Sequence, residues 1–195
     1  MSSKLLFQSI GGWASVISGL LLASAHLINL LGGTDNGTVL GKSLVLCGHI
    51  GLIFAFIGLF EAQKTSDILG RLGMLSGVIG TVFVTAIVFV EIAGASGVNI
   101  DPVLNEGISS TIYMAGPLLF VLGMILFGIS VIKENILPRM GGIGLIMGTL
   151  VFAMAAFIPD IQGIITVIGA IITGAGFVWL GIYLLYYIGK RESTK

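Results

Sequence analysis

The stretch LGMLSGVIGTVFVTAIVFVEIAGAS, residues 72–96, contains a single ionisable side chain, the carboxylate of Glu91. About 20 mostly apolar residues in an α-helix are enough to cross the hydrocarbon core of a bilayer. Backbone groups in lipid must be hydrogen-bonded within their own segment, and this run is too uniformly apolar for an outer-membrane strand. The stretch therefore predicts a transmembrane helix, and it decides the fold class.

Five similar apolar runs lie on either side of this stretch and extend the prediction to the whole chain. The first run contains Ala23-Ser24-Ala25, which is similar to a signal-peptidase site, but apolar residues continue past it to Leu31. We therefore interpret this run as a membrane helix rather than as a cleaved signal. The prediction is an all-α polytopic membrane protein with a single transmembrane domain over residues 1–195. Its six spans are expected at residues 9–31, 39–60, 72–96, 111–132, 140–158 and 161–188.

The composition excludes several classes of protein. Hydrophobic residues make up 56% of the 195 residues and charged residues only 9%, whereas soluble domains carry about 25% charged residues. The formal net charge is zero, and no basic face for nucleic acid is visible. Cys47 is the only cysteine, so an internal disulfide is excluded.

The basic residues predict the orientation of the chain. Lysine and arginine are enriched in cytoplasmic segments of membrane proteins. Lys42 is the one basic residue on the other side of the predicted topology. We therefore expect both termini in the cytoplasm of a cell whose inner (plasma) membrane holds the protein. The residues on the predicted cytoplasmic side are Lys4, Lys64, Arg71, Lys133, Arg139, Lys190, Arg191 and Lys195.

A repeated motif predicts three helical hairpins. Residues 68–73, ILGRLG, open the third span, and residues 136–141, ILPRMG, open the fifth. Gly80-Thr81 and Gly148-Thr149 then follow at the same offset. A fixed period of this kind is the mark of a repeated supersecondary unit. Because the repeats run in parallel, they differ from the inverted repeats of many secondary transporters.

Glycines are spaced to bring helices close together. The chain has 30 of them, and the third span places Gly73, Gly77 and Gly80 on neighbouring positions of one face. Small residues let helix backbones approach closely in lipid. These faces predict either a tightly packed bundle or contacts with a second copy or another membrane protein, and the sequence leaves both open.

Glu91 is the first candidate binding residue, because ionisable groups inside a membrane are costly and usually functional. It lies 18 residues after Gly73 and 11 after Gly80, which places all three on one helix face. We therefore expect its carboxyl to face the bundle interior. Its role is either to bind a proton, a cation or a polar ligand, or to join two helices through a hydrogen bond.

Two histidines and a tyrosine complete the candidates. His26 lies on the glycine face of its own span and is expected at the depth of Glu91, within reach of its carboxyl. His49 is expected deeper and on a different face, which argues against a metal or haem site built from these groups. Tyr113 precedes Pro117 by four residues, so its carbonyl lacks a helical partner. The predicted binding residues are His26, Glu91 and Tyr113, without a metal or other cofactor.

The chain resembles a broad group of uncharacterised bacterial six-span membrane proteins. The triple hairpin is also similar to the HdeD-like family of acid-stress membrane proteins, from which the long segment 97–110 departs. The resemblance implies a bacterial inner membrane and the six-span architecture. It rests on 59–63 (LFEAQ), 69–73 (LGRLG), Gly80-Thr81, Glu91, 136–139 (ILPR) and 179–181 (WLG).

The sequence leaves three functions open. It contains no catalytic motif, so we expect that the protein is not an enzyme. The first is a partner or structural membrane protein without chemistry of its own. The second is a transporter or substrate-binding membrane subunit with an outward-facing polar pocket. The third is an intramembrane metal or redox protein.

Overall fold

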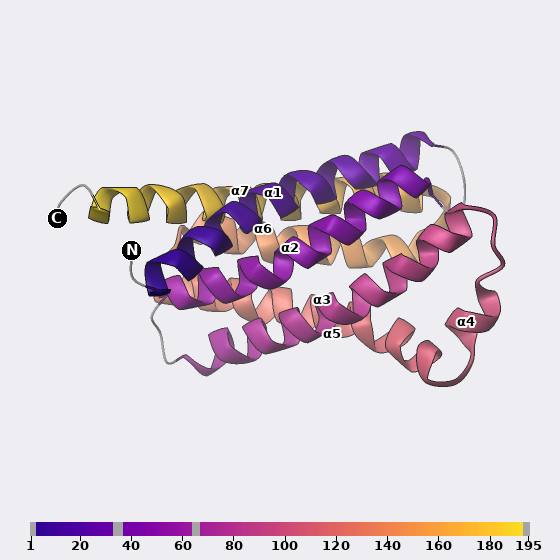
Figure 1. The fold of residues 1–195 in the computed structure, drawn as a ribbon, viewed down its shortest axis with the longest axis horizontal. Coiled ribbons are helices and arrows are strands. Elements are labelled where there is room, and N and C mark those ends of the chain that lie inside the picture. The colour runs from indigo at the N-terminus through magenta and orange to yellow at the C-terminus, as the bar shows by residue number, and fades with distance from the viewer. Residues whose placement is uncertain (1–2, 33–36, 64–66, 193–195) are drawn as a thin grey trace.

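The computed structural model describes residues 3–32, 37–63 and 67–192. Lys64 and Lys195, two of the basic residues used to predict the orientation, lie outside these residues. The described segments of regular structure are all helical (Figure 1). They are α1 (Ser3–Leu31), α2 (Val39–Gln63), α3 (Ile68–Ala95), α4 (Asp101–Asn105), α5 (Gly107–Glu134), α6 (Arg139–Met154), η1 (Ala155–Phe157), η2 (Pro159–Ile161) and α7 (Gln162–Glu192).

Six of these helices are long and apolar enough to cross a membrane, which confirms the predicted all-α, six-span fold. The helices α1, α2, α3, α5 and α7 each span between 25 and 31 residues. The fifth span joins the shorter α6 to the following 3-10 turn, Arg139–Phe157. The chain is therefore a multi-pass membrane protein.

The six long helices form a closed ring. Each packs against its neighbour in the chain, and α7 returns to pack against α1. The pairs α1–α2, α3–α5 and α6–α7 are the three predicted hairpins. Both termini lie at one end of the bundle, here called the proximal end (Figure 1). The opposite end, here called the distal end, carries the α1–α2 connection, α4 and the turns η1 and η2.

Two connections at the distal end contain short helical segments that the sequence did not predict. Segment 97–110 is not one loop, because α4 forms within it with Pro102 at its start, and Gly107 then turns the chain with a φ of 59°. The fourth span consequently begins at residue 107 rather than 111. The fifth predicted span ends its α-helix at Met154, and 3-10 turns carry the chain past Pro159, which has no N–H to continue a helix.

The two copies of the repeated motif start their helices differently. Residues 68–70 are the first residues of α3, where Asp67 Oδ2 accepts a hydrogen bond from Gly70 N at 3.2 Å. A capping carboxylate of this kind satisfies a free N–H at a helix start. In the second copy α6 begins only at Arg139, because Pro138 disfavours helical geometry in the residue before it.

The glycine faces are filled within the chain. A Cβ on Gly11 would overlap Gly58 of α2, one on Gly123 would overlap Gly77 of α3, and one on Gly174 would overlap α1. These close approaches between backbones hold neighbouring helices together. An oligomer or partner contact through glycine-rich faces stays a prediction, and it would need surfaces other than these contacts.

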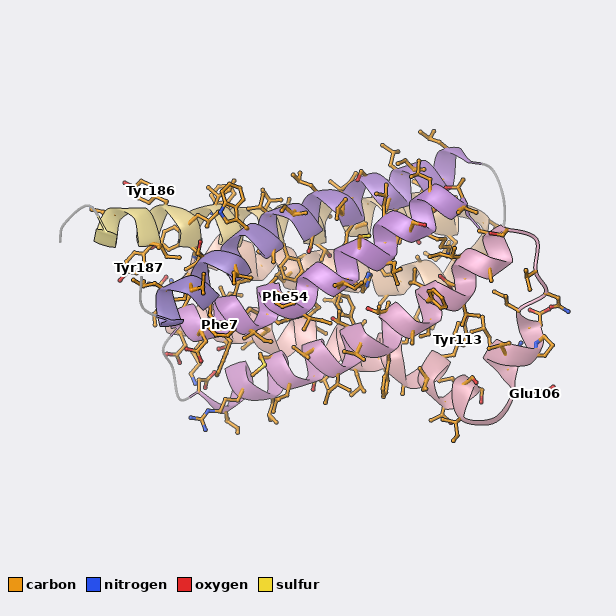
Figure 2. All side chains as sticks on the ribbon, in the orientation of Figure 1. Phe7, Phe54, Glu106, Tyr113, Tyr186 and Tyr187 are labelled. Atoms are coloured by element: carbon orange, nitrogen blue, oxygen red, sulfur yellow. The ribbon has the colours of Figure 1, made fainter. Side chains whose placement is uncertain are left out.

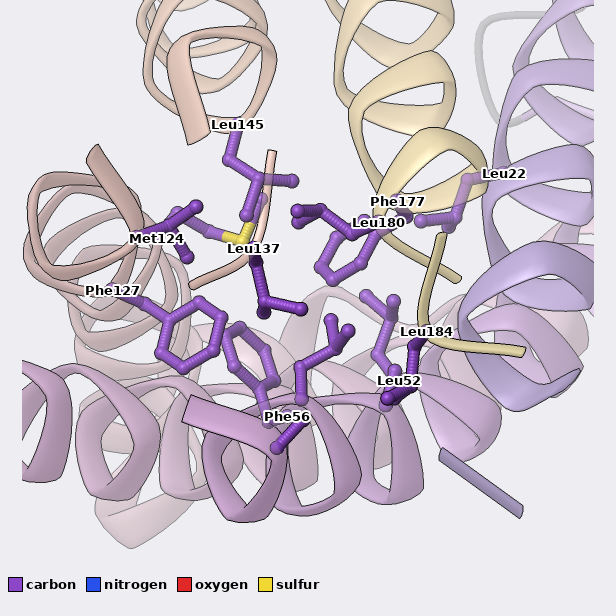
Figure 3. Close-up of a cluster of buried hydrophobic side chains, with 14 of the residues drawn as sticks. Leu22, Leu52, Phe56, Met124, Phe127, Leu137, Leu145, Phe177, Leu180 and Leu184 are labelled. Carbon is purple, nitrogen blue, oxygen red and sulfur yellow. The ribbon is translucent and has the colours of Figure 1, made fainter. Parts of the chain in front are cut away.

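The middle of the ring is closed by three phenylalanines, one from the returning helix of each hairpin. The ring of Phe56 meets Phe127 edge to face at 5.5 Å and Phe177 at 5.8 Å, measured between centroids (Figure 3). All three side chains are fully buried. We call Phe56, Phe127 and Phe177 the aromatic seal.

Candidate functional site

An ion pair joins α2 to α3 near the distal end. Lys42 Nζ lies 2.7 Å from Glu91 Oε2, and the two side chains are 20% and 25% exposed. Glu91 was predicted to face the bundle, and it does so with a cation beside it. Its partner is Lys42 rather than the predicted His26. Within the described residues, His26 makes no hydrogen bond to Glu91.

The α1–α2 connection fixes the position of Lys42. Asn29 Oδ1 accepts a hydrogen bond from the Thr38 N–H at 2.9 Å and from the Thr38 hydroxyl at 3.2 Å. The same hydroxyl accepts the Gly41 N–H at 2.9 Å and so caps the start of α2. Because Lys42 follows directly, this network sets the direction in which its side chain leaves the helix.

His49 lies deeper in the interior, seven residues after Lys42 and so on the same face of α2. It is 6% exposed, and its Nδ1 lies 2.9 Å from the carbonyl oxygen of Val45. A carbonyl only accepts, so Nδ1 carries the hydrogen, and in a neutral ring Nε2 is an acceptor. The His49 ring packs on Phe120 of α5 at 5.6 Å.

His26 enters the same region from α1. Its ring meets Phe152 of α6 edge to face at 5.2 Å, although α1 and α6 are not neighbours in the ring of helices. It is also within electrostatic range of His49 and Lys42. The two rings have different neighbours, Phe152 for His26 and Phe120 for His49, so the predicted difference in depth and face stays a prediction. We call His26, Lys42, His49 and Glu91 the distal polar cluster.

Tyr113 lies at about the same depth along the bundle axis as the Lys42–Glu91 ion pair, as its spacing from Phe120 indicates. It precedes Phe120 by seven residues, as Lys42 precedes His49, and α2 and α5 run in the same direction. Because His49 contacts Phe120, the same step along both helices, about 10 Å, brings Tyr113 to the level of Lys42. Its side chain is 42% exposed at the distal end (Figure 2). Pro117 lies within α5 and cannot donate to the carbonyl of Tyr113.

Sequence reasoning missed Lys42 as a site residue. The sequence did contain an indication of this role, because Lys42 is the one basic residue on the predicted outer side of the membrane. A lone cation opposite an interior carboxylate is the expected counter-ion in a membrane bundle. The exception to the charge bias was thus the most informative basic residue in the sequence.

Three buried hydroxyls have no hydrogen-bond partner among the described residues. They belong to Ser18, Thr81 and Thr149, one on the outgoing helix of each hairpin. Thr81 and Thr149 occupy equivalent positions of the repeated motif. Buried polar atoms are usually satisfied by protein or by water. The interior around mid-depth therefore keeps hydrogen-bonding capacity that the chain itself does not use.

The proximal end has a different polar contact, made by Asp67, which lies between two membrane spans. Lys133 Nζ donates to Asp67 Oδ1 at 2.9 Å, and Lys133 is largely exposed. That hydrogen bond is the main cause that lowers the pKa of Asp67, helped by the Gly70 N–H. Next to it the Ser130 hydroxyl donates to Gln63 Oε1 at 3.3 Å. These contacts tie the α2–α3 turn to α5.

The donor set limits the chemistry of the distal polar cluster. No group of three or more His, Cys, Asp or Glu side chains in the described part of the chain is placed to hold a metal ion. The cluster offers a cation, a carboxylate and two imidazoles, which suit recognition of a polar molecule. The chain matches no protein-family model, no curated protein and no solved structure.

Proposed function

We propose that this membrane protein binds a small polar molecule between its helices at the distal end and carries out no reaction of its own. The observation that supports this proposal is the Lys42–Glu91 ion pair above two interior histidines. Placing such groups among membrane helices costs free energy, so they are seldom present without a role. A hydrogen bond between two neutral side chains would join α2 to α3 at lower cost.

The aromatic seal favours binding over open passage. Phe56 lies seven residues below His49 on the same face of α2, about 10 Å along the axis. Beyond it, Phe127 and Phe177 close the middle of the ring. A molecule that enters from the distal end therefore stops above the seal.

The charge distribution supports an outward-facing distal end. Arg71, Arg139 and Lys190 lie toward the proximal end, with both termini. By the positive-inside tendency this end belongs in the cytoplasm. The resemblance to bacterial six-span proteins supports an inner-membrane location, in which the distal polar cluster would face outward.

Native mass spectrometry of the protein, extracted gently from its host membrane, tests the proposal. We expect a stoichiometric small molecule on the wild type, and its loss from the Glu91→Gln variant. Glu106→Gln makes the same chemical change at an exposed carboxylate of the distal end and should keep the molecule (Figure 2). A bare wild-type protein, or equal occupancy in both variants, would refute ligand binding at this cluster.

A second candidate function is that of a partner or structural membrane protein. The observation that favours it is the C-terminal part of α7, which projects past the other helices at the proximal end (Figure 1). A Cβ added to Gly189 would lie more than 4 Å from the described residues beyond its own turn of α7, and Tyr186 is strongly exposed. In the same spectra this function predicts a second polypeptide, no small molecule, and no effect of Glu91→Gln.

A further inference from the structure

We propose that the bound molecule is a zwitterion with an apolar tail, in which an ammonium and an acidic oxygen group lie a few bonds apart. This inference rests on the proposed function, and it names the chemical class of the ligand. Two sources share this chemistry: a free amino acid with an apolar side chain, and the headgroup of an ethanolamine phospholipid.

Charge balance at the ion pair favours a zwitterionic ligand. Lys42 and Glu91 neutralise each other at 2.7 Å in a partly buried position. A ligand with one charge would take one partner and leave the other uncompensated, which is costly away from water. A zwitterion gives its acidic oxygens to Lys42 and its ammonium to Glu91, so both charges stay paired.

Among the described residues, Lys42 and Glu91 form the one ion pair at the distal end. Among the described residues that Lys42 and Glu91 are shown to contact or influence, the other titratable group is His26. Asn29 is occupied by the Thr38 backbone and hydroxyl groups. The recognition element is therefore one positive and one negative group, side by side.

The interior below the pair sets the nature of the tail. Phe120 on α5 lies against the His49 ring, and Phe152 on α6, which is 37% exposed, lies against the His26 ring. Val84 precedes Glu91 by seven residues and shares its face of α3. Aromatic and aliphatic walls favour an apolar tail, and the acceptor nitrogen of His49 is the remaining polar contact.

Three probes of one shape and different charge test the inference. L-Phenylalanine carries both charges, 2-phenylethylamine only the ammonium, and 3-phenylpropionate only the carboxylate. Binding is measured by calorimetry on the detergent-solubilised protein, with dihexanoyl phosphatidylethanolamine as the lipid arm. We expect the wild type to bind L-phenylalanine or the lipid about tenfold more tightly than either singly charged probe, because a charged hydrogen bond is lost with each.

Two variants then invert the preference. Lys42→Met leaves Glu91 alone and should favour 2-phenylethylamine, whereas Glu91→Gln leaves Lys42 alone and should favour 3-phenylpropionate. Glu106→Gln is the matched control and should bind as the wild type does. Tighter binding of L-phenylalanine than of the lipid assigns a free amino acid, and the reverse assigns a lipid headgroup.

The failures of the inference and of the proposed function are distinguishable. If native spectra show a small molecule that Glu91→Gln removes, but the wild type binds neither zwitterion or binds all probes equally, the ligand class is wrong and the binding function stands. If the native protein is bare and no probe binds, both are wrong. The wild-type comparison requires no variant, so a variant that misfolds leaves the test intact.

Discussion

The distal and proximal halves of the bundle interior share one helix framework but differ in what fills it. On α2, Lys42 and His49 occupy the distal half, and Phe56 follows at the next seven-residue step. On α5, Phe120 faces His49 and Phe127 faces Phe56, again seven residues apart. The helices therefore keep one register throughout, while the interior changes from titratable groups to the aromatic seal.

This difference separates two tasks of the same helices. The proximal half obtains its stability from buried rings and close backbone contacts, which are insensitive to charge. The distal half places a cation, a carboxylate and two imidazoles where apolar side chains would pack at lower cost. A bundle selected only for stability would carry the proximal pattern to both ends.

Removing a ring of the aromatic seal should have the largest effect on the stability of the bundle. Phe56→Ala deletes a ring that contacts both Phe127 and Phe177 and leaves a cavity at the centre of the ring of helices. We expect a loss of about 4 kcal/mol in the free energy of unfolding, measured by thermal or denaturant unfolding in detergent. Phe54→Ala, on the exposed side of the same helix, is the control and should cost much less (Figure 2). Equal losses would show that the three rings are not the centre of stability.

Separating two backbones of the second hairpin should have the next largest effect. A Cβ on Gly73 would lie 2.8 Å from the Phe127 Cα, so Gly73→Val forces α3 away from α5. We expect about 3 kcal/mol of destabilisation and a broadened peak in size-exclusion chromatography. Gly189→Val adds the same atoms where no neighbour lies within 4 Å and should elute as the wild type does. A sharp, stable Gly73→Val peak would contradict the close packing.

Replacing a distal histidine with phenylalanine makes the distal interior resemble the proximal one. This change should separate ligand binding from stability. His49→Phe nearly conserves ring size beside Phe120, so unfolding should change by about 1 kcal/mol or less. The bound small molecule should nevertheless be lost in native mass spectra, because the imidazole acceptor is gone. A large loss of stability would instead assign His49 a structural role through its bond to Val45.

The smallest expected effect lies at the proximal end and depends on pH. The folded pKa of Asp67 is below the ordinary 3.8, so its charge stabilises the fold above that value and loses this contribution as pH falls through the folded pKa. Asp67→Asn keeps the helix cap but not the charge. Its small deficit in melting temperature at pH 7 should shrink below about pH 4. A deficit that persists unchanged in acid would exclude the Lys133 contact as its source.

The sequence was sufficient for the fold because apolar runs and glycine spacing record helix length and packing directly. It also predicted that Glu91 faces the interior, since that follows from its spacing to Gly73 and Gly80. It did not reveal that Lys42 is the partner of Glu91. That contact depends on how α2 and α3 are aligned along their axes, which the sequence of either helix alone does not determine. For the same reason the contact of His26 with Phe152 was not predicted, because it joins α1 to α6, two helices that are not neighbours in the ring.

The contact between α1 and α7 has a consequence for how the protein is made. Gly12 and Gly19 of α1 pack against Gly181 and Gly174 of α7, which is synthesised later than the other five long helices described. Until α7 has been inserted, one face of α1 can only be covered by lipid or by an insertion factor. Ring closure therefore requires that α7 has been inserted, and a chain truncated before α7 would expose an unmatched glycine face to the quality-control machinery of the membrane.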